Sequence, residues 1–311
     1  MRKRVGVVGC GRWGVKHLMA LQNIPDVVEC IVACDLDEVT LKSIQSESIQ
    51  IHNDPKTLVG KFGLDAVVVV TPNETHYSLG IQFLSQGVDV FLEKPMATTF
   101  DHASALVSTA IEEGSALKSG FLLRFHPCIE DAKSKIHGGK IGAIQSIHYR
   151  KKTTRKDDSV SHSLDSLAIH GVDLAEYILN DQTPLRISEV LGTRTQSQLT
   201  LEYPNQVEIH IDVGWNAATN ISELEILGTG GRILIQLQNH KDFIIENEDI
   251  RTVSVNSNRT PLEGVLHDFL VSNLPSTASS TGSILRTIQC IEIARSQLIA
   301  SGRSDTRELK R

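Results

Sequence analysis

The sequence predicts an α/β protein, in which an N-terminal doubly wound parallel sheet precedes an α+β domain with a large, mainly antiparallel sheet. Short apolar runs alternate with helix-length segments up to about residue 120. A glycine-rich turn follows the first apolar run. Farther along the chain, isoleucines alternate with polar residues, the period of two that strands with one buried face show.

Length and composition bound the class of protein. A chain of 311 residues is long enough for two domains, which we place at residues 1–121 and 122–311. Hydrophobic residues make up 40% and charged residues 22%, as in ordinary globular proteins. A net charge of −6 without a long basic block argues against nucleic acid as a partner.

Apolar stretches and cysteines predict the compartment. The apolar stretches, such as Ala66–Val70, are far shorter than the roughly 20 residues that span a bilayer, and residues 1–4 lead directly into a strand. We therefore expect neither a membrane segment nor a signal peptide. The five cysteines are odd in number and contain no Cys-x-x-Cys pair, which favours free thiols in the cytoplasm.

The first domain is expected to alternate strands and helices. Four consecutive valines, Val67–Val70, suit a parallel strand that is covered on both faces. Pro25 ends the first helix. The predicted strands are 4–8, 27–34, 49–51, 65–71, 88–92 and 117–122, and the predicted helices are 13–21, one including 41–44, 75–86 and 101–113.

The second domain is expected to be a broad sheet covered by helices. Alternation predicts strands at 144–149, 207–213 and 233–237, and the Gly228-Thr229-Gly230-Gly231 turn predicts a hairpin between 224–227 and 232–235. Helices at 129–137, 164–179, 262–274 and 283–299 are expected to cover this sheet.

The glycine-rich turn has the spacing Gly-x-Gly-x-x-Gly between a strand and a helix. Gly9 permits the tight turn, Gly11 lets the backbone approach a pyrophosphate, and Gly14 lets the helix pack closely on the strand. The helix start, with Arg12 and Trp13, then faces the phosphates. A glycine-rich loop without a ligand is the alternative.

An acidic residue strengthens the case for a dinucleotide. Asp35 ends the second apolar run, about twenty residues beyond the glycines, where a carboxylate accepts hydrogen bonds from ribose hydroxyls and repels a 2′-phosphate. We therefore expect NAD as cofactor rather than NADP. The alternative is that Asp35 starts the following helix.

Two further motifs follow predicted strands of the first domain. One is Thr71-Pro72-Asn73-Glu74-Thr75-His76, and the other is Glu93-Lys94-Pro95. Because ligands of open parallel sheets gather at the carboxyl ends of the strands, both motifs are expected to face the dinucleotide. Lys94 can donate a proton or hydrogen bond to an oxygen that gains charge during hydride transfer. A solvated surface pair is the alternative.

These motifs, together with a later His-x-x-Asp, occur in the order found in the glucose-fructose oxidoreductase, inositol dehydrogenase and rhizopine-catabolism (Gfo/Idh/MocA) family, which the chain resembles over nearly its whole length. The resemblance implies a Rossmann domain that holds NAD or NADP. It implies that Thr71, Pro72, Asn73, His76, Glu93 and Lys94 line the nicotinamide and that Lys94 is catalytic. It also implies a homodimer or homotetramer formed through the second sheet.

The segment around His170 resembles the family's second catalytic motif, in which an aspartate precedes the histidine by four residues. Here the position four residues before His170 is Ser166. Asp165 lies five residues before His170, roughly 140° away from it around an ideal helix. His170 remains a candidate for proton transfer because its ordinary pKa lies near neutrality. Asp165, Ser166 and Asp173 are candidate substrate contacts. A histidine packed beneath the sheet is the alternative.

Other charged residues are weaker candidates. Arg124 follows the last predicted strand of the first domain, where similar proteins often place a residue facing substrate. A basic cluster could meet a phosphorylated or nucleotide-linked sugar, although such runs are usually solvated. Its members are Arg150, Lys151, Lys152, Arg155 and Lys156. No group of histidines, cysteines and carboxylates has the spacing of a metal site.

The sequence therefore predicts an NAD(P)-dependent oxidoreductase that interconverts a secondary alcohol and a ketone on a sugar, cyclitol or sugar derivative, with Lys94 and His170 as catalytic residues. One rival hypothesis is a dinucleotide-bound regulatory or scaffolding protein without turnover. Another is a reductase of a non-carbohydrate substrate.

Overall fold

The computed structural model describes residues 1–156, 161–272 and 278–301. They form two compact units: residues 1–122 with 261–288, and residues 123–260 with the described residues from 289 onward. The boundary between residues 288 and 289 falls within one helix. The segment 261–288, which we had predicted to belong to the second domain, therefore groups with the first unit.

The first unit contains a parallel six-stranded sheet in the order β3-β2-β1-β4-β5-β6. Its strands are β1 (Lys3–Val8), β2 (Val28–Cys34), β3 (Ile49–His52), β4 (Ala66–Val69), β5 (Asp89–Leu92) and β6 (Leu117–Ser119). Its helices are α1 (Arg12–Gln22), α2 (Glu38–Ile44), α3 (Leu58–Phe62), α4 (Asn73–Leu84), α5 (Phe100–Glu112), α8 (Pro261–Val271) and the start of α9 (Ala278–Ala300). The predicted doubly wound sheet is confirmed.

The core of this unit follows the apolar runs. Every residue of β4 is fully buried, as predicted for Val67, Val68 and Val69, whereas Val70 follows the strand and is partly exposed. The predicted strand 117–122 is shorter, because β6 ends at Ser119 and a 3₁₀ turn, Leu122–Phe125, follows. The predicted helix 262–274 appears as α8, and residues 273 and 274 lie outside the described part of the chain.

We had predicted that the helix over 262–274 covers the second sheet, but α8 packs within the first unit. It contacts α1, and Asn23 at the end of α1 donates to the Glu263 carboxylate at 2.7 Å. The Phe269 ring meets the Phe91 ring edge-on with centroids 5.7 Å apart. The apolar face of α8 was visible in the sequence, but its partner was not.

The second unit contains an eight-stranded sheet in the order β14-β13-β12-β11-β7-β10-β9-β8. Neighbouring strands are antiparallel except β7 and β10, which confirms the predicted mainly antiparallel sheet. The strands are β7 (Ile144–Lys152), β8 (Arg186–Gly192), β9 (Gln196–Tyr203), β10 (Val207–Gly214), β11 (Ile221–Gly228), β12 (Gly231–Gln236), β13 (Asp242–Glu246) and β14 (Ile250–Ser254). The predicted glycine turn joins β11 to β12.

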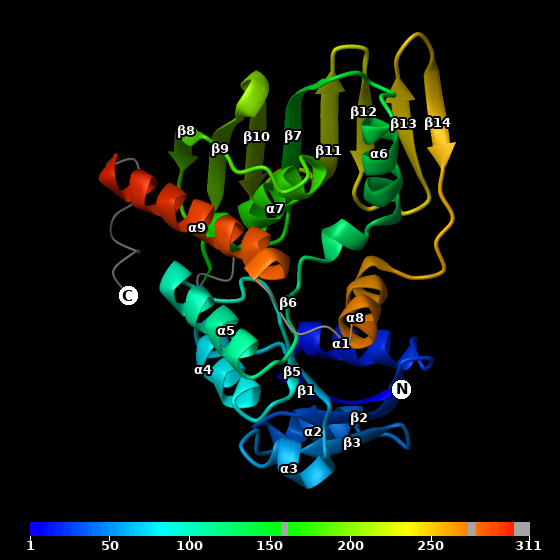
Figure 1. Ribbon diagram of the computed structural model, residues 1–311, viewed down its shortest axis with the longest axis vertical. Helices are drawn as coiled ribbons and strands as arrows, with labels where there is room; N and C mark the ends of the chain where they lie inside the picture. Colours follow the sequence, from blue (N-terminus) through cyan, green and yellow to red (C-terminus); the bar gives the residue numbers. More distant parts are fainter. Residues whose placement is uncertain (157–160, 273–277, 302–311) are drawn as a thin grey trace. The chain divides into compact units, whose positions relative to one another are not determined.

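The two faces of this sheet differ. One face is buried and is covered by α6 (Pro127–His137) and α7 (Ile169–Ile178) (Figure 1). The opposite face carries partly exposed side chains in register, one from each of five neighbouring strands. This row, called the outer row below, consists of His210, His148, Glu225, Leu234 and Ile244.

The segment predicted as one helix over 164–179 is not regular. Residues Leu164–Ala168 form a π-helical turn, and the α-helix α7 begins only at Ile169. A π turn bonds residue i to i+5, which places one residue more in the turn than an α-helix does. The angle of 140° that we expected between Asp165 and His170 therefore does not hold here.

Candidate functional site

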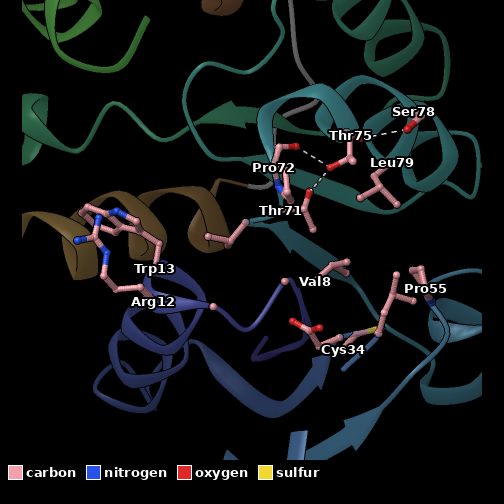
Figure 2. Close-up of a pocket in the computed structure, with 15 residues that line it drawn as sticks. Val8, Arg12, Trp13, Cys34, Pro55, Thr71, Pro72, Thr75, Ser78 and Leu79 are labelled. Carbon is pink, nitrogen blue, oxygen red and sulfur yellow. Dashed lines mark hydrogen bonds between the residues drawn. The ribbon is translucent and has the colours of Figure 1, made fainter. Parts of the chain in front are cut away.

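A cavity of about 740 Å³ opens in the first unit at the carboxyl ends of the central strands (Figure 2). The glycine turn contributes Gly9, Gly11, Arg12 and Trp13 to its lining. The end of β2 and the segments that follow β2 and β4 contribute Cys34, Asp35, Leu36, Val70, Thr71 and Pro72, and α4 contributes Thr75. Cofactors of doubly wound sheets bind at this edge.

The three glycines of the turn are required for different physical reasons. Gly9 has a φ of +91°, and a Cβ there would lie 2.6 Å from the Val70 carbonyl oxygen. A Cβ on Gly14 would lie 2.0 Å from the Gly9 carbonyl oxygen. By contrast, a Cβ on Gly11 would meet no described atom within 4 Å and would project into open space. The chain's own packing therefore explains Gly9 and Gly14, whereas a ligand close to the backbone would explain Gly11.

The start of α1 suits an anion. The first backbone N–H groups of a helix lack intrahelical acceptors, and the helix dipole favours negative charge there. The first turn of α1 carries no acidic residue. Arg12 and Trp13 lie together at one side of the cavity (Figure 2), and the Lys16 ammonium sits 4.3 Å from the Trp13 ring centroid. The residues present therefore fit a pyrophosphate.

Asp35 is held in place at the end of β2. One carboxylate oxygen accepts from the Cys10 N–H at 2.7 Å, and the other accepts from the Asp37 N–H at 2.9 Å. The following helix is capped by Asp37, whose carboxylate accepts from the N–H groups of Val39 and Thr40. Asp35 therefore does not serve as the cap of α2, and its carboxylate is fixed against the glycine turn.

The Thr71–His76 motif divides between cavity and interior. Thr71, Pro72 and Thr75 line the cavity, and the hydroxyls of the two threonines lie 2.6 Å apart (Figure 2). Asn73 and His76 are not part of the lining. The buried His76 ring lies 2.9 Å from the Thr71 carbonyl and 2.8 Å from the Pro95 carbonyl, so it joins the two predicted motifs.

The second motif shows a similar division. Lys94 is partly exposed and precedes a cis peptide bond to Pro95. Glu93 is 9% exposed and does not line the cavity. Its carboxylate turns to the interior, where it accepts a hydrogen bond from His17 at 2.8 Å. We had predicted Glu93 as a cofactor contact, and His17 was missed.

In the second unit, His170 is partly exposed at the start of α7. Asp165 and Ser166 lie in the π turn before it. The Asp165 carboxylate forms an ion pair with Arg295 of α9. This carboxylate is thus already neutralised by a cation that the sequence did not suggest as its partner.

Arg124 and Asp173 form a buried ion pair. The Arg124 guanidinium donates from Nε at 2.9 Å and from Nη2 at 2.7 Å to one Asp173 oxygen. The second oxygen is buried and has no hydrogen-bond partner within the described part of the chain. Burial raises the pKa of Asp173 to about 6, although Arg124 opposes this. Asp173 is thus fully buried and paired with Arg124, and its contact with a substrate stays a prediction.

The basic cluster is largely paired within its own sheet. Arg150 forms an ion pair with Glu223, and the Lys152 ammonium lies 2.5 Å from an Asp212 oxygen. These pairs leave less positive charge for a phosphorylated ligand than the sequence suggested. Within the described residues, no group of three histidine, cysteine or carboxylate side chains is arranged to hold a metal ion.

Several cavity residues were missed. Leu36 and Pro55 follow β2 and β3, so the rule that placed Asp35 at the cavity could have found them. Ser78 and Leu79 lie one turn beyond Thr75 on α4, where helical spacing brings them to the same side.

A doubly wound sheet with this glycine turn and cavity defines an NAD(P)-binding Rossmann fold. Residues 3–121 match the profile of the GFO_IDH_MocA oxidoreductases, described as having an NAD-binding Rossmann fold. This N-terminal part of the chain therefore has the sequence profile of the Gfo/Idh/MocA family. None of the helices in the described ranges combines the length and apolar character needed to cross a membrane.

Full-length relatives are similar over most of the chain. Inositol 2-dehydrogenase 1 of Saccharopolyspora erythraea is 28% identical over 254 residues, covering 76% of this chain and 75% of that protein. The scyllo-inositol 2-dehydrogenase (NAD+) of Bacillus subtilis is 27% identical over 268 residues, covering 78% and 76%. The 3-ketoreductase KijD10 of Actinomadura kijaniata, solved with NADP and TDP-benzene, shares the fold with a TM-score of 0.85 at 18% identity, covering 95% and 98%.

Proposed function

We propose that the protein is an NAD(P)-dependent dehydrogenase or reductase that interconverts a secondary alcohol and a ketone on a cyclitol, sugar or sugar derivative. The observation that carries the proposal is the cavity at the strand ends, with open space beside Gly11 and a fixed carboxylate at Asp35. The inositol dehydrogenases among the relatives support a polyhydroxylated substrate.

The proposed residue roles follow from the chemistry of hydride transfer. Bound NAD(P) supplies the hydride acceptor or donor at its nicotinamide ring. Lys94 exchanges the proton of the reacting oxygen and stabilises the charge that develops on it. His170 acts as a second proton-transfer group. Thr71 and Pro72 shape the wall of the dinucleotide cavity.

We propose NAD as the preferred cofactor. The Asp35 carboxylate can accept from ribose hydroxyls, and its negative charge would repel a 2′-phosphate. Neither Asp35 oxygen forms an ion pair with a basic side chain within the described residues; both accept from backbone N–H groups. We expect NADP to bind at least about tenfold more weakly than NAD, a difference in binding free energy of about 1.4 kcal/mol. Calorimetric titration with both cofactors measures this difference. Equal affinities would contradict the role of Asp35.

The activity is tested by screening cyclitols, free sugars and nucleotide sugars while following absorbance of the reduced cofactor. We expect turnover with at least one polyhydroxylated class, and a loss of about 10²–10⁴ in kcat for Lys94→Ala. Dinucleotide affinity of this variant should stay within a few-fold, because the glycine turn and Asp35 hold the other half of the molecule.

Other outcomes separate the rival hypotheses. Tight dinucleotide binding without turnover on any class would favour a regulatory or scaffolding protein. Turnover confined to carbonyl compounds without several hydroxyls would favour a reductase of a non-carbohydrate substrate. Turnover that is unchanged in Lys94→Ala would remove Lys94 from the mechanism.

We also propose that the protein assembles into a homodimer or homotetramer through the partly exposed face of the second sheet. Its outer row combines charged and apolar side chains on neighbouring strands, as self-complementary surfaces do.

A further inference from the structure

A carboxylate is enclosed directly beside the proposed catalytic lysine. Glu93 follows β5 and is 9% exposed. One of its oxygens accepts from His17 at 2.8 Å, and the other accepts from the Lys94 backbone N–H at 2.9 Å. A Cβ on Gly120 would lie 2.9 Å from the second oxygen, so only glycine fits there beside the carboxylate in its present position. Three segments that are distant in sequence thus meet at Glu93.

His17 shows that this contact is specific. It lies on α1, one turn beyond Gly14, and is fully buried. Its ring meets the Phe91 ring edge-on, with centroids 5.6 Å apart. Its Nδ1 atom is buried and, in the described ranges, has no hydrogen-bond partner. Burying an imidazole costs free energy that an aliphatic residue would not incur. The hydrogen bond to Glu93 is the compensating contact.

The charge of Glu93 faces two titratable groups, His17 from α1 and Lys94 from its own loop. Burial raises the pKa of Glu93, but the hydrogen bond from His17 and the charge of Lys94 outweigh burial and lower it. The carboxylate is therefore ionised at neutral pH. An ionised carboxylate close to an ammonium favours its protonated form.

We propose that His17 and Glu93 are a positioning pair for Lys94, in which His17 fixes the Glu93 carboxylate and Glu93 fixes the backbone and the protonation of Lys94. The proposal rests on the proposed role of Lys94 in the reaction. It couples α1, the helix that begins at the glycine turn, to the loop that carries Lys94, because His17 and Glu93 are one direct contact between them.

The primary test needs no substrate. The pKa of Lys94 is measured by competitive labelling with an amine-specific reagent over a range of pH, with the labelled peptide quantified by mass spectrometry. We expect Glu93→Gln, which keeps the shape and removes the charge, to lower the pKa of Lys94 by about 1. His17→Leu should lower the pKa of Lys94 by a smaller amount. In His17→Gln, which keeps an N–H donor, the pKa of Lys94 should return to that of the parent.

Kinetics give a second measurement once a substrate is known. We expect Glu93→Gln and His17→Leu each to lower kcat about tenfold while KM for the dinucleotide changes little. The double variant should lose less than the product of the two single losses, because both changes break one unit. Leu18→Val, a buried change on the same helix that leaves the histidine in place, is the matched control for a loss of packing.

Two results would overturn the proposal. One is an unchanged pKa of Lys94 in Glu93→Gln, and the other is a kinetic loss no larger than that of Leu18→Val at equal stability. Should His17→Leu fail to fold, the pKa of Lys94 in Glu93→Gln alone tests the proposal, because glutamine keeps the shape of the glutamate side chain. Absence of turnover on every substrate class would count against the proposed function, whereas the labelling result would still decide the pair.

Discussion

At the scale of single residues, one glycine of the turn is required for folding and another is expected to be required for binding. Gly14 is required because a side chain there would collide with the Gly9 carbonyl, whereas a side chain on Gly11 would project into empty space. We expect Gly11→Ala to leave the free energy of unfolding within about 0.5 kcal/mol of the parent. It should weaken dinucleotide binding at least about tenfold, or about 1.4 kcal/mol.

Gly14→Ala is the matched comparison. Overpacking against the Gly9 carbonyl should destabilise the fold by about 1–3 kcal/mol or more. Urea unfolding and calorimetric titration of both variants provide the two measurements. If Gly11→Ala binds the dinucleotide as tightly as the parent, the pyrophosphate does not lie on this turn.

The buried Asp173 makes stability depend on pH. Burial raises its pKa to about 6 from the ordinary 3.8. Between these values the folded state binds more protons than the unfolded state. The stabilising contribution of the Asp173 proton is therefore fully present below about pH 4 and is lost as pH rises through about 6. The full effect is about 3 kcal/mol at most.

We expect Asp173→Asn to remove this dependence. Relative to the variant, the parent should lose unfolding free energy between about pH 4 and about pH 6. Urea unfolding across this range measures the difference. Glu248→Gln, which removes an exposed carboxyl group, is the control. A difference between parent and Asp173→Asn that is constant with pH would contradict the raised pKa.

At the scale of elements, strand patterns were predicted well because they depend on local sequence. The valines of β4 and the glycine turn between β11 and β12 specify their elements without reference to distant residues. The short helix α3 and four strands of the second sheet, β8, β9, β13 and β14, were not predicted. β8 and β14 have few buried residues, but the alternation in β9 could have been found.

Contacts between distant segments could not be predicted. His17 and Glu93 are 76 residues apart, and Asp165 and Arg295 are 130 apart. No spacing rule links such pairs, because the tertiary fold alone brings them together. Local motifs therefore indicated Lys94 and Asp35 as candidate site residues. They did not indicate His17, which holds Glu93, or Arg295, which neutralises Asp165.

The π turn before α7 leads to a prediction about the helix that carries His170. Because Asp165 is paired with Arg295, its removal should affect stability more than chemistry. We expect His170→Ala to reduce kcat most, Ser166→Ala less and Asp165→Ala least.

Steady-state kinetics and urea unfolding of the three variants test this order. If Asp165→Ala is the most harmful to kcat at unchanged stability, the π turn has made Asp165 the partner of His170. If no variant changes kcat, His170 is not a proton-transfer group, and the regulatory hypothesis gains support.

At the scale of the whole molecule, the second sheet has one face covered by helices and one face that presents the outer row. Leu234 lies in this row between Glu225 and Ile244. In an interface between two copies related by a two-fold axis, the same patch contributes from both sides. A single substitution there therefore acts twice.

We expect the parent protein to be a dimer or tetramer and Leu234→Arg to be monomeric, because two unpaired guanidinium groups would be buried in one interface. Light scattering coupled to size exclusion, at several protein concentrations, gives the mass. Leu185→Arg, at a position that is 69% exposed outside the sheet, should leave the assembly unchanged. A monomeric parent, or a Leu234→Arg variant that keeps the mass of the parent, would show that this face of the sheet does not hold the copies together.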